Sequence, residues 1–497
     1  MTTKPNLLLI TADQMRWDSA GFAGNCNVQT PNLDALASRG VVFENAFTPN
    51  PICVPARASI MTGNYPQVCT GIKNNSGCIK PGQPLLTGTL KGAGYRTYAS
   101  GKLHFVPYSP PGKPRLVHGF DEVNLTESGR ILSLFDPKGE MEGLEDYFDY
   151  LKKSGWKGYS RAHGIGNNDV RPCPSPLPQE LYVDSWIADC TIKQVDRHLK
   201  ESPDRPFFIW MSSPKPHSPC DPPRPYDNLV DPRKIPFPAG NASDLESRNP
   251  YIETVRMTHA LDSLSPQAWQ VIRSYYYGNI SFLDAMIGRV LKHLEGKGLM
   301  EDTIVLFTSD HGDLLGDFGG AFKCNHLNGS VRVPFLICGP GIHRGRRIAD
   351  LAGLQDILPT FAEAAGTAIN SPVQGESLWK KITGDTEEPV REVFYSSTMD
   401  SPNQSAMTTD GKWKYIYSEG NGTEELYNQK EDPAEVENLA EEKSCRDRIS
   451  HYREVLREEA LRLEDTAIIA GKGFAHAHVD REKIKKLQVS GMGWRWY

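Results

Sequence analysis

Two short apolar runs constrain the fold of this chain more than any other feature. Leu7–Ile10 and Ile304–Phe307 are apolar at every position, whereas a strand with one face in water alternates apolar and polar residues. Such runs are typical of central strands in a parallel sheet that helices cover on both faces. The sequence therefore predicts an α/β fold built on a mostly parallel sheet.

Helical segments lie between the apolar runs. The segment 31–40 begins with a proline after Thr30 and ends at a glycine, and a long amphipathic segment runs from 266 to a glycine at 296 or 298. Two further apolar runs, 207–211 and 334–337, are predicted strands. Strands that alternate with helices indicate βαβ units, which supports the parallel sheet.

The sequence pattern changes at about residue 385. Segments such as 412–417 alternate apolar and polar residues, and Asp410-Gly411 is typical of a hairpin turn. A charged amphipathic helix is predicted over 447–464. The predicted division is a large α/β domain at 1–384, a small α+β subdomain of antiparallel sheet and helix at 385–465, and an aromatic, basic tail at 466–497.

The charge and the hydropathy of the chain exclude several classes of protein. The formal net charge is −6, so the chain lacks the basic excess of a nucleic-acid-binding protein. No apolar run approaches the roughly 18–20 residues that cross a bilayer, and the four apolar residues 7–10 are too few for the core of a signal peptide. We therefore expect no nucleic-acid partner, no membrane insertion and a cytoplasmic location, unless an export signal has been removed.

The two central strands end in similar polar pairs. Asp13-Gln14 follows the first run and Asp310-His311 follows the second. Ligands of open α/β sheets bind at the carboxyl ends of the strands, where these side chains are expected to converge. A single Asp at such a position is more often a helix N-cap. Because the pattern occurs twice, it favours a site for a divalent cation.

A second candidate element is the short helix that Cys53 begins. Pro55 lies near its first turn, and Gly63 follows its end. The helix dipole and Arg57, one turn further on, favour a low thiol pKa at Cys53. A cysteine at a helix end is commonly structural, so this pattern alone does not assign a role.

The residues around Cys53 nevertheless resemble a known signature. Cys53-Val-Pro-Ala-Arg57, followed by Ala58-Ser59 and Thr62-Gly63, is similar to the signature of type I, formylglycine-dependent sulfatases in the alkaline-phosphatase-like superfamily. Further motifs of the family occur in its order, and the resemblance extends from residue 5 to about 465. These motifs are Asp13-Gln14, Gly101-Lys102-Leu103-His104, Pro216-His217-Ser218-Pro219, Asp310-His311-Gly312-Asp313, Phe322-Lys323 and the C-terminal motif Glu425–Pro433.

The resemblance implies a nucleophile and a metal site. Cys53 matches the cysteine that a formylglycine-generating maturation enzyme oxidises to formylglycine, whose hydrated aldehyde attacks the sulfur of a sulfate ester. A bound metal lowers the pKa of that nucleophile. The metal site is implied at Asp13, Gln14, Cys53, Asp310 and His311.

The resemblance also implies roles for polar residues around the nucleophile. Arg57 matches the residue that holds the formylglycine, with Lys102 close by, and His104 matches the base that deprotonates its second hydroxyl. His217 and Lys323 match groups that bind the ester oxygens and stabilise or protonate the leaving oxygen. Lys102 is also implied in substrate binding. Asn74 lies where some relatives place a residue that contacts the substrate.

Two positions depart from the common family pattern. Gln14 and His311 stand where most members have Asp and Asn. Both substitutions resemble those of the branch of phosphonate monoester and phosphodiester hydrolases, and choline-sulfatase-like enzymes share the His. We expect Ca²⁺ as the first choice of ion, and the imidazole favours Mn²⁺ as the alternative.

The predicted function is hydrolysis of a small organic sulfate monoester. A phosphonate monoester or phosphodiester hydrolase that uses the same site, and a member whose Cys53 stays a thiol and only binds a ligand, are the alternatives. Substrate specificity is expected in the long loops 105–180 and 214–260. The tail is expected to support a homo-oligomer, as similar extensions do in that branch.

Overall fold

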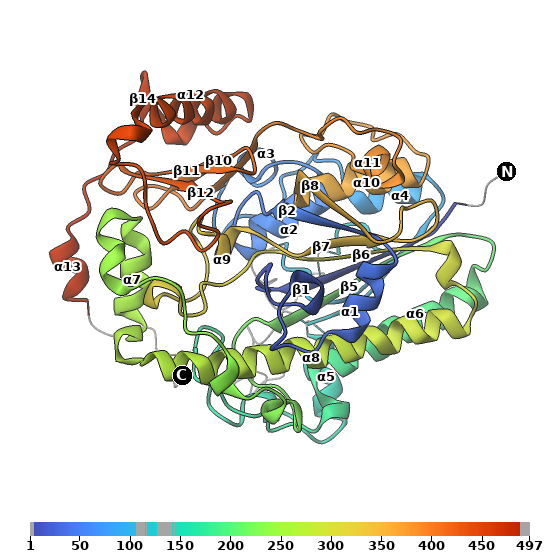
Figure 1. Cartoon of the computed structure of the whole chain (residues 1–497). Coiled ribbons are helices and arrows are strands. Elements are labelled where there is room, and N and C mark those ends of the chain that lie inside the picture. The colour runs from blue at the N-terminus through green and yellow to red at the C-terminus, as the bar shows by residue number, and fades with distance from the viewer. Residues whose placement is uncertain (1–3, 106–114, 116, 127–141, 144, 488–497) are drawn as a thin grey trace.

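The structure is a computed structural model that describes residues 4–105, 115, 117–126, 142–143 and 145–487. A large central sheet lies between two layers of helices, and a smaller sheet near the C-terminus lies at one end of it (Figure 1). The large sheet has eight strands in the order β4-β3-β5-β1-β6-β7-β2-β8. Their bounds are β1 Asn6–Asp13, β2 Val41–Phe47, β3 Arg96–Gly101, β4 Glu122–Leu125, β5 Phe207–Pro216, β6 Thr303–Ser309, β7 Phe335–Cys338 and β8 Arg346–Gly353.

The predicted mostly parallel α/β sheet is confirmed. β1 lies at the centre and pairs in parallel with β5 and β6, and the apolar run 304–307 lies in β6. β7 is antiparallel to both of its neighbours, β6 and β2.

Helices cover both faces of the large sheet, which explains why β1 is apolar without interruption. Leu8 and Ile10 pack into a core with helices α1, α5, α6 and α8, whereas Leu7 and Leu9 pack into a second core with α2, α4, α10 and α11. Alternate side chains of a strand point to opposite faces, so both sets are buried. The helices are α1 Pro31–Ser38, α5 Asp146–Lys153, α6 Val183–Glu201 and α8 Pro266–Gly296 on one face, and α2 Cys53–Thr62, α4 Leu86–Gly92, α10 Ile357–Ala364 and α11 Trp379–Thr383 on the other.

The C-terminal region contains the second sheet. Four antiparallel strands lie in the order β12-β11-β10-β9, and helix α12 packs on one face through Tyr452 and Leu456. The hairpin turn between β10 and β11 falls at Asp410-Gly411, where Gly411 has φ of 86°. The bounds are β9 Phe394–Thr398, β10 Ser405–Thr409, β11 Trp413–Ser418, β12 Thr423–Asn428 and α12 Arg446–Arg462, with shorter elements α3 Pro66–Cys69, α7 Pro250–Thr258, α9 Asn328–Val331, β13 Ile469–Ala470, β14 Gly473–Phe474 and α13 Arg481–Lys485.

Two stretches differ from the sequence-based expectation. The segment 105–180, expected as a long loop, contributes the edge strand β4 and helix α5 in its described part. The tail lies on its own chain as far as 487: the Tyr417 hydroxyl donates to the Ala475 carbonyl at 2.8 Å, and Arg481 pairs with Glu253. The last ten residues, 488–497, lie outside the described residues, and the oligomeric role of the tail stays a prediction. Within the described ranges, no helix is both long and apolar enough to cross a bilayer.

Candidate functional site

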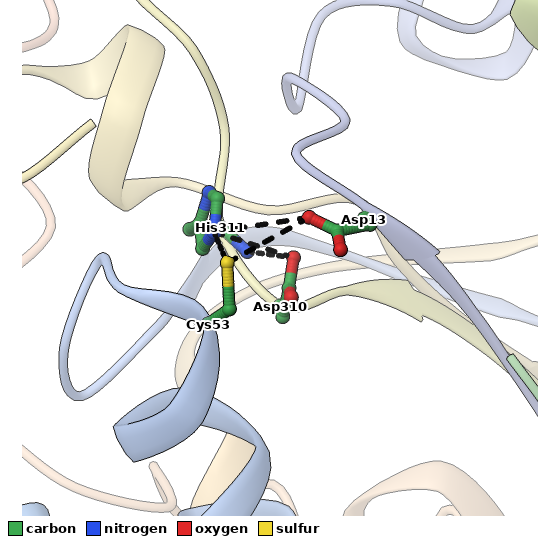
Figure 2. Close-up of side chains that lie close together, drawn as sticks. All are labelled: Asp13, Cys53, Asp310 and His311. Atoms are coloured by element: carbon green, nitrogen blue, oxygen red, sulfur yellow. Dashed lines mark hydrogen bonds and ion pairs between the residues drawn. The ribbon is translucent and has the colours of Figure 1, made fainter. Parts of the chain in front are cut away.

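Four buried side chains from three elements meet at the carboxyl edge of the large sheet. Asp13 ends β1, Asp310 and His311 follow the adjacent parallel strand β6, and Cys53 is the first residue of α2. One ligand atom from each side chain lies within 4.8 Å of all the others, and the four side chains point toward one another (Figure 2). The sequence prediction that the two strand ends converge is confirmed.

The Cys53 sulfur faces the Nε2 nitrogen of His311. Cys53 Sγ lies 3.1 Å from His311 Nε2 and 3.9 Å from Asp13 Oδ1. His311 Nδ1 lies 2.9 Å from the carbonyl oxygen of Gly312. Because a carbonyl only accepts, Nδ1 carries a hydrogen, and Nε2 is the ring nitrogen that faces the cluster. Burial would lower the pKa of His311, but Asp310 and Cys53 outweigh it and raise that pKa. Once deprotonated, Nε2 is the atom that could bind a metal.

The guanidinium of Arg57 contacts the carboxylates of both Asp13 and Asp310. Its Nε donates to Asp310 Oδ2 at 2.8 Å, and its Nη2 lies 3.5 Å from Asp13 Oδ2. Its Nη1 donates to the Lys102 carbonyl at 2.6 Å and to Ser212 Oγ at 2.8 Å, so Arg57 also connects β3 with β5. The guanidinium is fully buried, and a planar buried fork of this kind fixes the orientation of its partners.

Cations surround Asp13. Lys102 Nζ donates directly to Asp13 Oδ2. Burial alone would raise the pKa of Asp13, but the charges of Lys102 and Arg57 outweigh it and hold that pKa well below its usual range. Asp13 is therefore a carboxylate, ready to bind a cation, across the neutral pH range.

Gln14 is held beside the cluster in a strained conformation. Its φ of 67° lies in the left-handed region, and its backbone N–H donates to Asp310 Oδ1 at 3.0 Å. Its side-chain Nε2 donates to Asp313 Oδ2 at 2.5 Å, and its Oε1 accepts from Lys323 Nζ. The structure thus brings Gln14 next to the cluster of Asp13, Cys53, Asp310 and His311, with its side chain engaged by Asp313 and Lys323.

His217 and Lys323 form a pair at the rim of the cluster. Lys323 Nζ lies 2.8 Å from His217 Nε2, and His217 Nδ1 lies 3.0 Å from the Ser218 carbonyl. Nδ1 must donate to that carbonyl, so Nε2 accepts from the Lys323 ammonium. Burial and the Lys323 charge lower the pKa of His217 well below 6.5. Burial would lower the pKa of Lys323, but Cys53 and Asp13 outweigh it and raise that pKa. The shared proton therefore belongs to Lys323.

The thiol of Cys53 has an anion-stabilising environment. Burial raises its pKa, but the charges of Lys323, Lys102 and His311 outweigh burial and the nearby Asp13, so the pKa is lowered. The same cations would stabilise negative charge on the oxygens of a bound sulfate.

Two further predicted site residues, His104 and Asn74, lie in the segments that follow β3 and α3. His104 is buried, with φ of 54°, two residues beyond Lys102. The Asn74 side chain donates to Asp400 Oδ2 at 2.5 Å and accepts from Ser76. The catalytic and substrate-binding roles of His104 and Asn74 stay predictions.

The sequence analysis assigned no role to three residues that position Arg57, Gln14 and helix α2. Ser212 on β5 accepts from Arg57, and Asp313 holds Gln14. Asn75 Oδ1 accepts from the Val54 backbone N–H at 3.1 Å and so caps α2 directly behind Cys53. Asp313 falls inside a quoted motif, but no local pattern marks Ser212 or Asn75, because their partners are distant in the sequence.

Comparison with known families decides the identity. The sequence model of the sulfatase family matches residues 5–367, and a model described as N-sulphoglucosamine sulphohydrolase, C-terminal, matches residues 316–462. The chain belongs to the sulfatase family. It is a sulfuric ester hydrolase, which confirms the predicted enzyme class.

Curated relatives of this sulfatase align over most of their length. An arylsulfatase of Clostridium perfringens is 30% identical over 92% of this chain and 94% of the relative. A choline-sulfatase of Rhizobium meliloti is 32% identical over 89% of this chain and 83% of the relative.

Solved structures confirm the fold. A phosphonate monoester hydrolase of Agrobacterium radiobacter superimposes with a TM-score of 0.77 at 24% identity, over 95% of this sulfatase and 100% of the other chain. A protein solved in complex with its substrate D-glucosamine-2-N,6-O-disulfate gives a TM-score of 0.73 at 21% identity over 93% of this chain and 99% of the other. At these identities the likeness establishes the alkaline-phosphatase-like fold alone.

Proposed function

We propose that this sulfatase cleaves an organic sulfate monoester with a formylglycine, formed from Cys53, as its nucleophile. The position of the Cys53 side chain is the observation that carries the proposal. Cys53 begins α2, and its Sγ lies 3.1 Å from His311 Nε2 beside the buried carboxylates of Asp13 and Asp310. It also occupies the signature position at which the cysteine of type I sulfatases is oxidised by the maturation enzyme. A hydrated aldehyde there would supply a hydroxyl nucleophile.

The donor set fits a divalent metal. Asp13, Asp310 and His311 offer two carboxylates and one imidazole lone pair from buried positions, and we propose that Gln14 completes the set with its amide oxygen. The metal would supply Lewis acidity and lower the pKa of the nucleophile. We propose Ca²⁺ as the resident ion with Mn²⁺ as the alternative, which the metal content of the purified enzyme decides.

The chain's own cations prepare the site for a sulfate dianion. Arg57 fixes Asp13 and Asp310 in place, so these carboxylates need little reorganisation when charge moves. Lys102 and Lys323 place two ammonium groups within reach of Asp13 and Gln14, at the edge where the ester oxygens would lie.

Lys323 and His217 would assist departure of the leaving oxygen. In the structure Lys323 Nζ holds the proton and His217 Nε2 accepts from it, so the pair can lend a proton to an oxygen that gains negative charge. We propose that His104 accepts the proton that must be removed before sulfate is released, and that Asn74 contacts the substrate.

The proposal also requires a maturation enzyme. Because a thiol at position 53 lacks the second hydroxyl that expels sulfate, a formylglycine-generating enzyme must modify Cys53. We further propose that the functional form is a homo-oligomer and is cytoplasmic.

The test compares two esters that share one leaving group. The chain is co-expressed with a formylglycine-generating enzyme and assayed with 4-nitrophenyl sulfate and 4-nitrophenyl phenylphosphonate. We expect a higher kcat/KM for the sulfate, and Cys53→Ala should reduce turnover by about 10⁴-fold or more. The exposed Cys26→Ala serves as the control and should leave turnover unchanged. Faster hydrolysis of the phosphonate would overturn the proposed substrate, and full activity of Cys53→Ala would overturn the nucleophile.

A further inference from the structure

A pocket of about 510 Å³ lies where the large sheet meets the C-terminal sheet. The large domain contributes part of β2 and the segments 17–23 and 332–335 to its wall. The C-terminal sheet contributes the hairpin turn at 411–412 and the residues 429–430 that follow β12 and include its last neighbour. Pockets that bind small molecules commonly enclose about 300–1,000 Å³. Among the described residues that line this pocket, none belongs to the catalytic cluster, so a ligand here would occupy a separate site.

Four cationic side chains line the pocket, against one carboxylate. The cations are Arg332, Arg347, Lys412 and Lys430, and the carboxylate is that of Glu44. Arg347 Nε donates to Glu44 Oε1 at 2.7 Å, so this carboxylate already has a cationic partner. The other three cations form no ion pair with any carboxylate in the part of the chain that the structure describes. The wall therefore keeps an excess of positive charge, which favours an anionic ligand.

Arg332 is the buried cation of the wall. It is only 8% exposed, and its guanidinium carbon lies 3.9 Å from the centre of the Trp17 ring. Its Nη2 donates to the Glu44 carbonyl, whereas its Nε is buried and has no hydrogen-bond partner among the described residues. Stacking on a ring covers the face of a guanidinium and leaves its edge for hydrogen bonds. Because a buried donor without a partner costs free energy, acceptor oxygens at this edge would be stabilising.

The charge of Arg332 is also poorly compensated. Glu435, Asp18 and Glu44 act to raise its pKa, but burial outweighs them and lowers that pKa to about 10. The guanidinium therefore still carries its charge at neutral pH. An oxyanion in the pocket would give this buried cation the paired negative charge that the described chain does not provide.

The rest of the wall is apolar and largely aromatic. Trp17, Phe22, Phe43 and Phe335 line it, and the rings of Phe43 and Phe335 pack edge to face with 5.6 Å between their centres. Aromatic surfaces of this kind pack well against a flat ring of a ligand. Rings beside unpaired cations fit a ligand that joins a ring to anionic groups.

We propose that this pocket is a second, non-catalytic site for an organic dianion, a ring compound with one oxyanion group against Arg332 and another held by the exposed Lys412 and Lys430. The two groups are carboxylates or sulfates, since both present several acceptor oxygens to a guanidinium or an ammonium. Two oxyanion groups also match three unpaired cations better than one does. The inference is independent of the proposed function, because binding here requires no turnover at Cys53.

The test uses naphthalene probes that contain no ester bond to hydrolyse. Naphthalene-1,5-disulfonate carries two oxyanion groups, with sulfonates in place of sulfates, naphthalene-1-sulfonate carries one, and naphthalene-1,5-diol carries none. Calorimetric titration of the purified protein measures their binding. We expect a dissociation constant about fivefold lower for the disulfonate than for the monosulfonate, and the weakest binding for the diol. Naphthalene-1,5-dicarboxylate, titrated in the same way, distinguishes carboxylate from sulfate as the preferred group.

Variants assign the binding to this pocket. Lys412→Ala combined with Lys430→Ala should weaken binding of the disulfonate by about fivefold and leave kcat/KM for 4-nitrophenyl sulfate within about twofold. Arg332→Met should weaken binding of both sulfonates by about tenfold or more. Lys292→Ala combined with Lys472→Ala is the matched control, because it removes two exposed lysines outside the pocket lining, and it should keep the full affinity.

The readouts separate this pocket from the catalytic cluster, which is also cationic. Inhibition of 4-nitrophenyl sulfate hydrolysis reports probe bound at the cluster, whereas the variants report probe bound in the pocket. If Arg332→Met does not fold, the lysine variant decides alone, since both of its side chains are exposed.

Three results would overturn the inference. The diol binds as tightly as the disulfonate, the folded pocket variants keep the wild-type affinity for the disulfonate, or neither ring dianion binds at about 10 mM. Each of these results leaves the sulfatase activity standing, because none of the titrations depends on hydrolysis.

Discussion

Asp13 contacts several of the charged groups of the site. Lys102 and Arg57 both face its Oδ2, and its Oδ1 faces Cys53. Two buried carboxylates so close together would repel strongly without these cations. The cations therefore let Asp13 stay ionised in a buried site, as the binding of a divalent metal requires.

The charge of Asp310 is the first residue-scale prediction. Asp310→Asn keeps the shape of the side chain but removes one negative charge from the cluster and weakens the contact with Arg57 Nε. We expect metal occupancy and kcat to fall together, kcat by about 10²-fold or more. Elemental analysis of the purified variant and steady-state rates check this. The surface variant Asp196→Asn should leave both unchanged, and an Asp310→Asn enzyme with full metal and full rate would contradict the assignment.

Asp184 gives a pH prediction at the same scale. Its pKa rises from 3.8 unfolded to about 6 in the folded protein because it is buried. The folded state thus binds the proton more tightly, and stability should fall by about 2–3 kcal/mol as pH rises from 4 to 6.

The Asp184→Asn variant removes this titration and keeps an acceptor for the Ser213 hydroxyl. Its free energy of unfolding, relative to the wild type, should therefore increase between pH 4 and pH 7. Denaturant titrations at the two pH values measure the difference. A relative stability that does not change with pH would show that Asp184 ionises freely in the folded protein.

The elements that position the site were the most predictable part of the fold. The apolar runs of β1 and β6 and the Cys53 helix ending at Gly63 all carry local signals, and the structure bears them out. β4 carries no such signal, because it has four residues at the sheet edge and is defined by pairing with β3. Ser212, likewise, is recognisable only from its tertiary contact with Arg57.

Gly101 provides a prediction about the junction of β3 and β5. It has φ of 106°, and a Cβ there would lie 1.8 Å from the Ser212 carbonyl oxygen. Gly101→Ala should push the strands apart, lower stability by about 3 kcal/mol or more, and displace Lys102 and Ser212 from Arg57. Thermal unfolding and activity measure both effects.

Gly92→Ala is the control for this substitution. Gly92 lies in α4, where an added Cβ meets nothing within 4 Å, so this variant should be neutral or slightly stabilised. Equal stabilities for the two variants would contradict the close packing of β3 against β5.

At the scale of the whole molecule, a buried ion pair connects the C-terminal region to the segment that caps the nucleophile helix α2. Lys73 Nζ lies 3.0 Å from Asp465 Oδ1, both side chains are buried, and the Tyr395 hydroxyl donates to Asp465 at 2.8 Å. The Lys73 carbonyl accepts from Asn50, and Asn75 caps α2 two residues later. No property of the sequence revealed this connection, because 392 positions separate the paired charges.

Breaking that buried pair should affect both stability and catalysis. Lys73→Met leaves the Asp465 charge buried without its cation, which should cost about 3–5 kcal/mol and loosen the segment that caps α2. We expect a lower unfolding midpoint and a reduced kcat. Lys412→Met removes an exposed lysine of the same region and should change neither. A Lys73→Met enzyme as stable as the control would show that the pair does not hold the two regions together.

The central claim is that formylglycine at position 53 is the nucleophile of this sulfatase. The most direct measurement is the mass of the tryptic peptide 40–57 from a preparation that hydrolyses 4-nitrophenyl sulfate. We predict a peptide about 18 Da lighter than the cysteine form, in a fraction that rises with specific activity. An unmodified thiol throughout an active preparation would contradict the claim.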